Sequence, residues 1–287
     1  MGIKKIIEGL NDSQKEAVLA SDKAVLVVAG PGTGKTLTIV RRIAYLIEEG
    51  VNPCNIVALT FTNRAASELR ERIKTFSEHT EGLFAGTFHL FGLKIIKDTT
   101  GDSFSILNRE GQVEIIKNLC SKNPLKILEK ISRIKNLLDE PEKDFEEILW
   151  QYQRVLAEKG LLDFDDLLLK AISLLSDEAF NYRYRASIRY LIVDEYQDIN
   201  PLQFRFLKVL SPASIFAVGD PDQSVYAFRG ANVKNFLDFE KDYPQAKRIV
   251  LDRNYRSQAF IVKASESVIE KNKERIKKRI IPVKEPV

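Results

Sequence analysis

Short, almost continuously apolar stretches alternate along the chain with longer segments whose apolar residues recur at helical spacing. The apolar stretches are rich in Val and Ile. This pattern is typical of strands in a parallel sheet that helices cover on both faces. The strands that it predicts are Ala24–Ala29, Ile56–Phe61, Tyr190–Val193, Ser214–Val218 and Arg248–Leu251.

Two helices have recognisable start signals. Ser13 is followed three residues later by Glu16, which is a capping-box pattern and predicts a helix beginning there. Thr62 precedes an amphipathic segment, Asn63–Thr75, in which one face is charged and the other is apolar. The apolar face consists of Ala65, Ala66, Leu69 and Ile73.

Residues 91–160 differ from the rest because they contain no convincing strand. They predict amphipathic helices around Glu110–Cys120, Leu125–Leu138 and Phe145–Lys159. We therefore expect an α/β fold of two sequence parts, 1–90 and 161–257, with an all-helical subdomain inserted at 91–160. A basic helical tail is expected at 258–287.

The tail contains a basic run, Lys271–Arg279, with six basic residues and one acidic residue. Such a run is most often the solvated face of a helix, which is what we expect here. It could instead contact nucleic-acid phosphates.

Composition narrows the class of protein only a little. The chain has 287 residues, 44% of them hydrophobic and 29% charged, and a formal net charge of +4. This mild basicity permits a nucleic-acid partner without requiring one. The two cysteines, Cys54 and Cys120, form no metal-binding pattern, and no apolar run is long enough to span a membrane. With no signal peptide recognisable, we expect a cytoplasmic protein.

A phosphate-binding loop follows the first predicted strand. The sequence AGPGTGKT at 29–36 lies between that strand and a predicted helix, Leu37–Glu49, and has Ala in place of the first Gly. Glycines let backbone N–H groups surround phosphates, and a helix N-terminus adds a favourable field. The predicted phosphate ligands are Gly30, Pro31, Gly32, Thr33, Gly34, Lys35 and Thr36, with Thr36 also offering its hydroxyl to Mg²⁺.

Paired acids follow another buried strand. Asp194 and Glu195 come directly after Tyr190–Val193. Alone, such a pair is as often solvated or helix-capping. With a phosphate-binding loop in the same chain, we expect Asp194 to hold Mg²⁺ and Glu195 to orient and deprotonate the attacking water.

The string DEYQD at 194–198 resembles motif II of superfamily 1 helicases of the UvrD/Rep type. Six further segments resemble that family's motifs in the same order, so the resemblance spans residues 10 to about 257. They are LNDSQ at 10–14, TFTNRAA at 60–66, GTFH at 86–89, LDFDDL at 162–167, GDPDQSVY at 219–226 and NYRS at 254–257.

The resemblance implies a RecA-like P-loop NTPase domain and four further nucleotide-site roles. Gln14 is expected to read the adenine edge and Tyr255 to stack on the base. Arg256 resembles an arginine finger for the γ-phosphate, and Gln223 a γ-phosphate sensor. From the residues alone, Tyr255 could instead be a core aromatic and Arg256 a surface ion-pair partner. Leu37 stands where many members have arginine, which puts one adenine-side contact in doubt.

The resemblance also implies a single-strand track of aromatic and basic side chains. Aromatic stacking on bases is sequence-tolerant, and arginines suit phosphate contacts. His89 could equally be a structural histidine, and Phe61 and Phe228 could be core residues; many members have tryptophan at the position of Phe228. The expected track is Phe61, Arg64, His89, Tyr226, Phe228 and Arg229.

Together these features predict the ATP-binding and single-stranded-DNA-binding lobe of a 3′–5′ DNA helicase or translocase acting in DNA repair or replication. ATP and Mg²⁺ are the expected cofactors, RNA is not excluded as the polymer, and a second RecA-like lobe is expected in a longer parent chain. The alternative is an isolated nucleotide-binding module with little turnover unless a second lobe pairs with it. A small-molecule P-loop kinase leaves DEYQD and GDPDQSVY unexplained.

Overall fold

The computed structural model describes residues 2–101, 104–225, 230–272 and 275–284. The chain forms two compact units. The first contains residues 1–87, 185–199 and 212–287, and the second contains residues 88–184 and 200–211.

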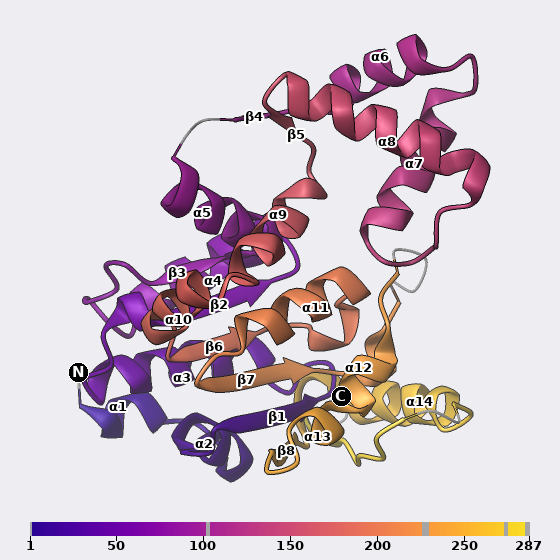
Figure 1. The fold of residues 1–287 in the computed structure, drawn as a ribbon. Helices are drawn as coiled ribbons and strands as arrows, with labels where there is room; N and C mark the ends of the chain where they lie inside the picture. The colour runs from indigo at the N-terminus through magenta and orange to yellow at the C-terminus, as the bar shows by residue number, and fades with distance from the viewer. Residues whose placement is uncertain (1, 102–103, 226–229, 273–274, 285–287) are drawn as a thin grey trace. The chain divides into compact units, whose positions relative to one another are not determined.

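A six-stranded parallel sheet forms the centre of the first unit, in the order β3-β2-β6-β7-β1-β8 (Figure 1). Because every strand runs in the same direction, the loops that follow their carboxyl ends meet at one edge of the sheet. The strands are β1 (Ala24–Ala29), β2 (Ile56–Thr60), β3 (Phe84–Thr87), β6 (Tyr190–Val193), β7 (Ser214–Gly219) and β8 (Lys247–Leu251).

The strands are continuously apolar because both of their faces are buried: every residue of β1 and of β2 is buried. Val25, Val27 and Ala29 point to one face, where they join a core with Ile39 and Leu69 from two helices. The helices of this unit are α1 (Ile3–Ile7), α2 (Asp12–Leu19), α3 (Lys35–Glu48), α4 (Asn63–Lys74), α12 (Val233–Leu237), α13 (Phe239–Asp242) and α14 (Ala259–Ile269). Short 3-10 turns lie at η1 (Pro53–Asn55), η2 (Tyr196–Asp198) and η3 (Pro221–Gln223).

The five predicted strands are confirmed, with shifts of at most one residue at their ends. The prediction that α2 begins at Ser13 is wrong. Asn11, two residues earlier, is the N-cap: its Oδ1 accepts the Gln14 N–H, and the Gln14 side chain accepts the Asn11 N–H, which completes the capping box. Thr62 caps α4 as predicted by accepting the N–H of Ala65.

The second unit is mainly helical. Its core packs α6, α7 and α8 around residues such as Ile116, Ile131 and Tyr152. The helices are α5 (Phe88–Thr100), α6 (Arg109–Leu119), α7 (Pro124–Lys135), α8 (Lys143–Glu158), α9 (Asp166–Leu175) and α11 (Pro201–Leu210), while α10 (Glu178–Ser187) crosses the boundary in sequence. The unit is larger than the predicted insertion 91–160 because α5 packs on α9, and α9 on α11. One two-residue pairing, β4 (Ser105–Ile106) with β5 (Leu161–Leu162), adds strand where none was expected.

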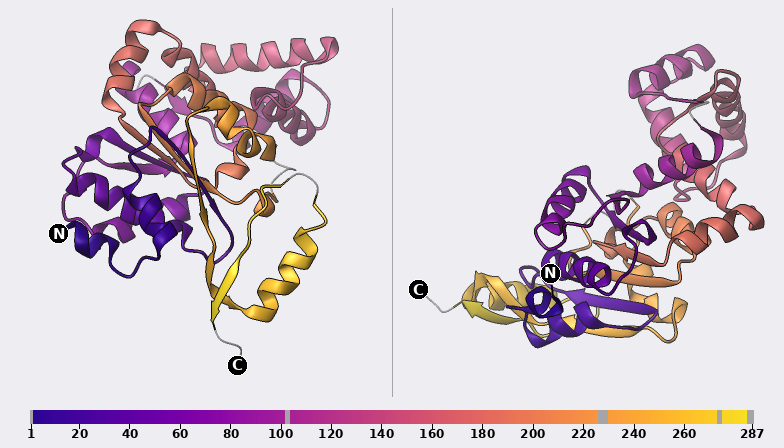
Figure 2. Two further views of the ribbon diagram at one scale, coloured as in Figure 1. Left: turned by 90° about the horizontal axis from the view of Figure 1, so that it is seen from below. Right: turned by 90° about the vertical axis from the view of Figure 1, so that its left-hand side faces the viewer.

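The prediction of a basic helical tail is wrong for much of its length. After α14 ends at Ile269, residues 275–280 have no regular structure, and β10 (Ile281–Lys284) pairs in parallel with β9 (Arg253–Gln258) (Figure 2). The basic run is therefore not a solvated helix face: the side chain of Lys278 is 3% exposed and ion-paired with Asp220 and Asp222. Two buried carboxylates draw this lysine inward, which the composition of the run does not reveal.

Candidate functional site

The loop between β1 and α3 has the backbone shape of a phosphate cradle. Gly32 and Gly34 have φ values of 72° and 90°, a region that disfavours any side chain. Thr33 is 1% exposed, and its hydroxyl donates to the carbonyl oxygen of Gly30 at 2.7 Å. Lys35 and Thr36 then begin α3, so the loop leads directly into a helix N-terminus.

Gln14 braces this loop from the outside. Its Nε2 donates to the carbonyl oxygen of Thr33 at 2.9 Å, and its Oε1 accepts the N–H of Asn11 at 3.1 Å. Gln14 is 2% exposed, and a Cβ placed on Gly34 would lie 2.6 Å from its Nε2. The carboxamide thus supports the loop through both of its polar atoms, and its expected contact with adenine stays a prediction.

Strand β9 lies against the other side of the loop. Asn254 Nδ2 donates to the carbonyl oxygen of Pro31 at 2.7 Å, and the Tyr255 N–H donates to that of Gly32 at 2.9 Å. The hydroxyl of Tyr255 accepts from Asn11 at 2.8 Å, while its side chain is 41% exposed. A Cβ on Gly32 would lie 2.6 Å from the Cβ of Arg256. The structure therefore brings Tyr255 and Arg256 to the phosphate loop, and the buried Asn254 is a loop-bracing residue that the sequence did not single out.

The paired acids lie beside the same loop. Lys35 Nζ donates to Glu195 Oε2 at 2.9 Å, with side-chain exposures of 13% and 35%. This ion pair joins residues 160 positions apart in sequence, from the helix after β1 to the turn after β6. The lysine predicted for phosphate and the acid predicted for water thus face one another.

Burial and the neighbouring Glu195 charge raise the pKa of Asp194 from 3.8 to about 7, opposed by Lys35. Burial likewise raises the pKa of Asp198 to about 6. Glu195 itself adopts φ 50° and ψ 46°, which is uncommon for a residue with a side chain. Carboxyl groups of elevated pKa beside an acidic residue in an uncommon backbone conformation are typical of sites that bind a cation or transfer a proton.

Gln197 connects this acidic turn to the turn after β7. Its Nε2 donates to Glu195 Oε2 at 2.9 Å, and its Oε1 accepts the N–H of Asp220 at 2.9 Å. Asp220 Oδ2 in turn accepts from Gln223 Nε2 at 2.6 Å. Lys35, Glu195, Gln197, Asp220 and Gln223 form one continuous chain of hydrogen bonds. Gln197 was not predicted as a site residue, although its place inside DEYQD was a signal.

The residues present suit a magnesium ion bound together with nucleotide phosphates. No group of three or more His, Cys, Asp or Glu side chains suited to a metal occurs among the described residues. Mg²⁺ at phosphate sites needs only one or two protein oxygens besides phosphate and water. Burial and the Glu195 charge raise the pKa of Asp194, and Lys35 only partly opposes them, so a further cation here would favour the charged carboxylate. Asp194 and Thr36 would hold such an ion, whose charge would offset that deficit.

The expected nucleic-acid residues are only partly described. Tyr226, Phe228 and Arg229 lie outside the described residues. In the first unit, Phe61 follows β2 and is partly buried, and Arg64 is exposed in the first turn of α4.

His89 belongs to the second unit. Its ring stacks on Phe164 with centroids 4.0 Å apart, its Nε2 is buried without a hydrogen-bond partner, and burial lowers its pKa to about 4. It is therefore a neutral aromatic surface at physiological pH. Phe164, which is 57% exposed, was missed as a candidate, although it lies in the quoted segment LDFDDL.

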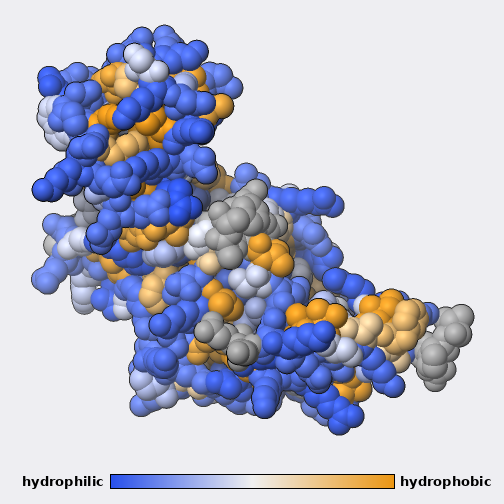
Figure 3. Space-filling model, turned by 90° about the vertical axis from the view of Figure 1, so that its right-hand side faces the viewer, coloured by the Kyte–Doolittle hydropathy of each residue, from blue (hydrophilic) through white to orange (hydrophobic). Residues whose placement is uncertain are grey.

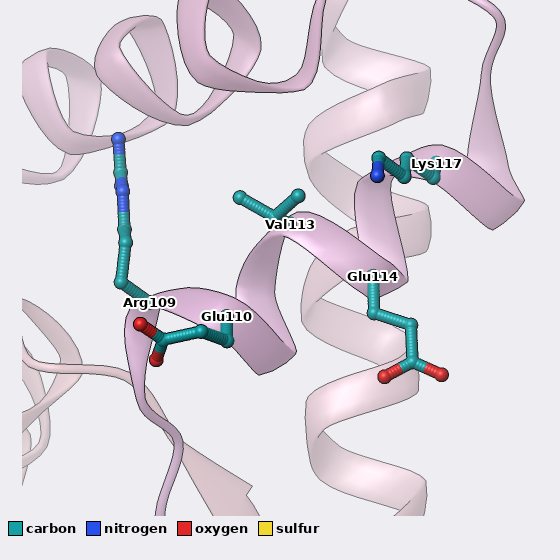
Figure 4. Close-up of a pocket in the computed structure, with 5 residues that line it drawn as sticks. All are labelled: Arg109, Glu110, Val113, Glu114 and Lys117. Atoms are coloured by element: carbon teal, nitrogen blue, oxygen red, sulfur yellow. The ribbon is translucent and has the colours of Figure 1, made fainter.

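A separate hollow lies on α6 in the second unit (Figure 4). Its lining combines two basic and two acidic side chains with one apolar side chain, all from this helix, and it is open to solvent. It lacks the converging polar groups of a ligand site. The lining residues are Arg109, Glu110, Val113, Glu114 and Lys117.

The chain is similar to known proteins over most of its length. The model of the family described as UvrD/REP helicase N-terminal domain matches residues 10–244. The ATP-dependent DNA helicase PcrA of Bacillus subtilis (strain 168) is 38% identical over 96% of this chain and 41% of its own length. The proteins of the same name from Staphylococcus epidermidis (strain ATCC 12228 / FDA PCI 1200) and Staphylococcus aureus (strain COL) are 38% identical over 94% of this chain and 41% of theirs. The chain thus spans about two fifths of the length of these relatives.

Proposed function

This chain belongs to the UvrD/REP helicase N-terminal domain family, and we propose that it is the ATP-binding lobe of a motor that moves 3′ to 5′ along single-stranded DNA. The observation that carries the proposal is the Lys35–Glu195 ion pair beneath a glycine loop against which Tyr255 and Arg256 are held. Relatives named ATP-dependent DNA helicases support the nucleotide and the polymer.

Each side chain of the pocket has a distinct task in ATP hydrolysis. Lys35 exchanges its pairing with Glu195 for the β- and γ-phosphates, which frees that carboxylate to orient and deprotonate water. Asp194 and Thr36 would hold Mg²⁺, which would supply positive charge to the phosphates. Arg256 reaches the γ-phosphate from β9 and stabilises the charge that develops as the bond breaks.

Tyr255 is suited to stack on the base. Its ring is partly exposed, and its position is fixed at two points: the hydroxyl at Asn11 and the backbone at Gly32. A preorganised ring loses little freedom on binding a base, which favours affinity. Gln14 then either brings its remaining amide N–H to the adenine edge or acts only through the loop.

The polymer track in the first unit begins with Phe61 and Arg64, at the carboxyl end of β2. Stacking on an aromatic ring contributes about 1–3 kcal/mol per base, and an exposed arginine in the first turn of a helix is suited to a phosphate contact. In the second unit, Phe164 stacked on His89 offers a further aromatic surface. Binding of dT and rU oligonucleotides of equal length distinguishes DNA from RNA as the preferred polymer.

A second lobe is proposed on the parent chain because the last elements leave apolar surface exposed. Space-filling views show hydrophobic residues open to solvent (Figure 3), and α14 and β10 carry a set of them. Together with the two-fifths coverage of the relatives, this favours a domain that continues in a further lobe. The exposed apolar residues are Phe260, Ile261, Val268, Ile281 and Val283.

The nucleotide-binding part of the proposal is tested with a fluorescent ATP analogue and Mg²⁺. Lys35→Met removes the phosphate-neutralising charge, so we expect at least a tenfold loss of affinity, or roughly 1.4 kcal/mol. Lys74→Met is the matched control, since Lys74 is exposed on α4 and pairs with the exposed Glu71 within its own helix. Equal affinity of Lys35→Met and the unmodified chain would exclude the proposed site.

The single-lobe alternative is tested by turnover. Without a facing lobe the γ-phosphate lacks a second set of ligands, so we expect this chain to show little DNA-stimulated ATP hydrolysis and no duplex unwinding. Steady-state ATPase with and without oligonucleotide, and a strand-displacement assay, measure both. Robust unwinding by the 287-residue chain would show that one lobe suffices.

A further inference from the structure

A buried ion cluster joins the turn after β7 to the segment that follows α14. Lys278 Nζ lies 2.5 Å from Asp220 Oδ1 and 2.5 Å from Asp222 Oδ2. Arg275 Nη2 lies 3.0 Å from the same Asp222 oxygen. All four side chains are at most 13% exposed. None of the seven segments that resemble helicase motifs contains Arg275 or Lys278.

Asp220 and Asp222 need Arg275 and Lys278 to offset their buried negative charges. Asp222 N donates to Asp220 Oδ1 at 3.1 Å, so the two residues lie in one tight turn. Two carboxylates buried this close repel one another, and each also loses its hydration. With Arg275 and Lys278 in place, the formal charge of the cluster is zero.

Asp220 connects Lys278 to Gln223, the predicted γ-phosphate sensor. Lys278 holds one oxygen of Asp220, and Gln223 Nε2 donates to the other at 2.6 Å. The backbone N–H of Asp220 is held by Gln197, which also bonds Glu195 beside Lys35. A carboxylate fixed at both oxygens and at its own backbone leaves Gln223 little freedom of orientation.

The segment carrying Lys278 is itself held against the nucleotide loop. Ile280 Cδ1 lies 2.7 Å from where a Cβ on Gly30 would be. The Ile280 N–H donates to Glu266 Oε1 at 3.2 Å, and the Ile281 N–H donates to the carbonyl oxygen of Asp252 at 2.6 Å. Lys278 therefore approaches Asp220 from backbone that is fixed on both α14 and β9.

We propose that Lys278 is a positioning residue for γ-phosphate recognition: it holds Asp220 so that Gln223 is oriented toward the terminal phosphate. The inference rests on the proposed ATP site. It extends the proposed γ-phosphate site into the segment after NYRS and makes preference for ATP over ADP depend on a side chain outside the seven quoted segments. Arg275 balances the charge of Asp222 and so supports the same turn.

The test compares Mg²⁺-dependent affinities for a non-hydrolysable ATP analogue and for ADP. Lys278→Met releases Asp220, so we expect ATP-analogue affinity to fall about five- to tenfold and ADP affinity to stay within about twofold. Lys277→Met is the matched control, because Lys277 is the exposed neighbour in the same basic run. It should leave both affinities within about twofold.

A second variant separates positioning from charge and from folding. Lys278→Met combined with Asp222→Asn leaves one acid, Asp220, and one base, Arg275, so the cluster stays formally neutral while the lysine is still removed from Asp220. We expect this double variant to regain the melting temperature lost by Lys278→Met and yet to keep the reduced preference for the ATP analogue. Recovery of that preference in the double variant would mean that Lys278 acts through net charge alone, and the inference would be wrong.

The outcomes also separate this inference from the proposed function. If the unmodified chain binds neither nucleotide in the presence of Mg²⁺, the ATP site itself is refuted. If the unmodified chain prefers the ATP analogue and Lys278→Met preserves that preference, only the positioning role of Lys278 is refuted.

Discussion

Single residues in this site serve two neighbours at once. Gln197 bonds Glu195 through its amide nitrogen and Asp220 through its oxygen, and Asn254 bonds Pro31 while accepting two backbone N–H groups. Both residues are at most 2% exposed. A buried amide that lost one partner would leave a polar group unsatisfied, at a cost of about 1–3 kcal/mol. Such residues therefore fix the relative positions of the turns that carry the chemistry.

Asp194→Asn should stabilise the chain in the absence of metal, increasingly as pH rises. Burial raises the pKa of Asp194 from 3.8 to about 7, so the folded chain holds a proton that the unfolded chain releases. The resulting destabilisation is absent below about pH 4, grows through the interval up to about pH 7, and is fully present above it. Asparagine cannot ionise and avoids this destabilisation. The gain in free energy of unfolding of Asp194→Asn over the unmodified chain should therefore grow by up to about 1.4 kcal/mol per pH unit in that interval.

Urea unfolding at pH 5 and pH 8 in the presence of EDTA measures this advantage. Asp12→Asn serves as the comparison, because Asp12 is an exposed residue in the first turn of α2. An Asp194→Asn advantage that is the same at both pH values would show that this carboxyl group titrates normally.

At the scale of elements, the sequence predicted those parts of the fold whose signals are local. The strands were found because burial on both faces makes them continuously apolar. Strand β3 was missed because its four residues, Phe84–Thr87, include Gly86 and lack β-branched residues before the last position. Strand β10 was missed because its pairing with β9 is non-local and its sequence, beginning Ile281-Pro282, carries no strand signal.

The same distinction between local and non-local signals applies to the residues of the candidate site. The glycines, Lys35 and the acids of DEYQD could be proposed from local patterns, a glycine loop between a strand and a helix and paired acids after a buried strand, and their roles stay predictions. Gln197, Asn254 and Lys278 act through contacts that span between 23 and 223 positions, and nothing local specifies those partners. The burial of Lys278 in the basic run depends on Asp222 and Asp220, which lie 56 and 58 positions away.

In the second unit, a buried ion cluster lies where α7, α8 and α9 meet. We expect this cluster to contribute to the stability of the unit. Lys135 Nζ lies 2.6 Å from Asp163 and 2.8 Å from Asp166, with all three side chains at most 9% exposed. Lys135→Met leaves two buried carboxylates unpaired, so we expect a loss of about 3–5 kcal/mol in the free energy of unfolding. Burial already raises the pKa of Asp166 while Lys135 opposes that rise, so the loss should be smaller at pH 5 than at pH 8.

The measurement uses the fluorescence of Trp150 on α8, because it is the only tryptophan in the chain and lies in this unit. Lys130→Met is the matched control on the same helix: Lys130 pairs with Glu142, which is 77% exposed, so a loss of at most about 1 kcal/mol is expected. Similar losses for the two variants would show that the Lys135 cluster contributes no more than a surface pair.

At the scale of the whole molecule, a net charge of only +4 gives little general attraction to a polyanion. Affinity for single-stranded DNA must then come from a few placed cations and rings, and salt dependence counts the cations. For single strands the slope of log affinity against log salt is roughly −0.7 per phosphate contact. If Arg64 makes one such contact, Arg64→Ala should make the slope shallower by about 0.7. Arg72→Ala, on the same helix but paired with Glu68, should leave the slope unchanged.

Anisotropy of a labelled dT oligonucleotide between about 25 and 200 mM salt supplies the slopes. Identical slopes for Arg64→Ala and the unmodified chain would remove Arg64 from the track, whereas a uniform loss of affinity without a change of slope would assign it a structural role in α4.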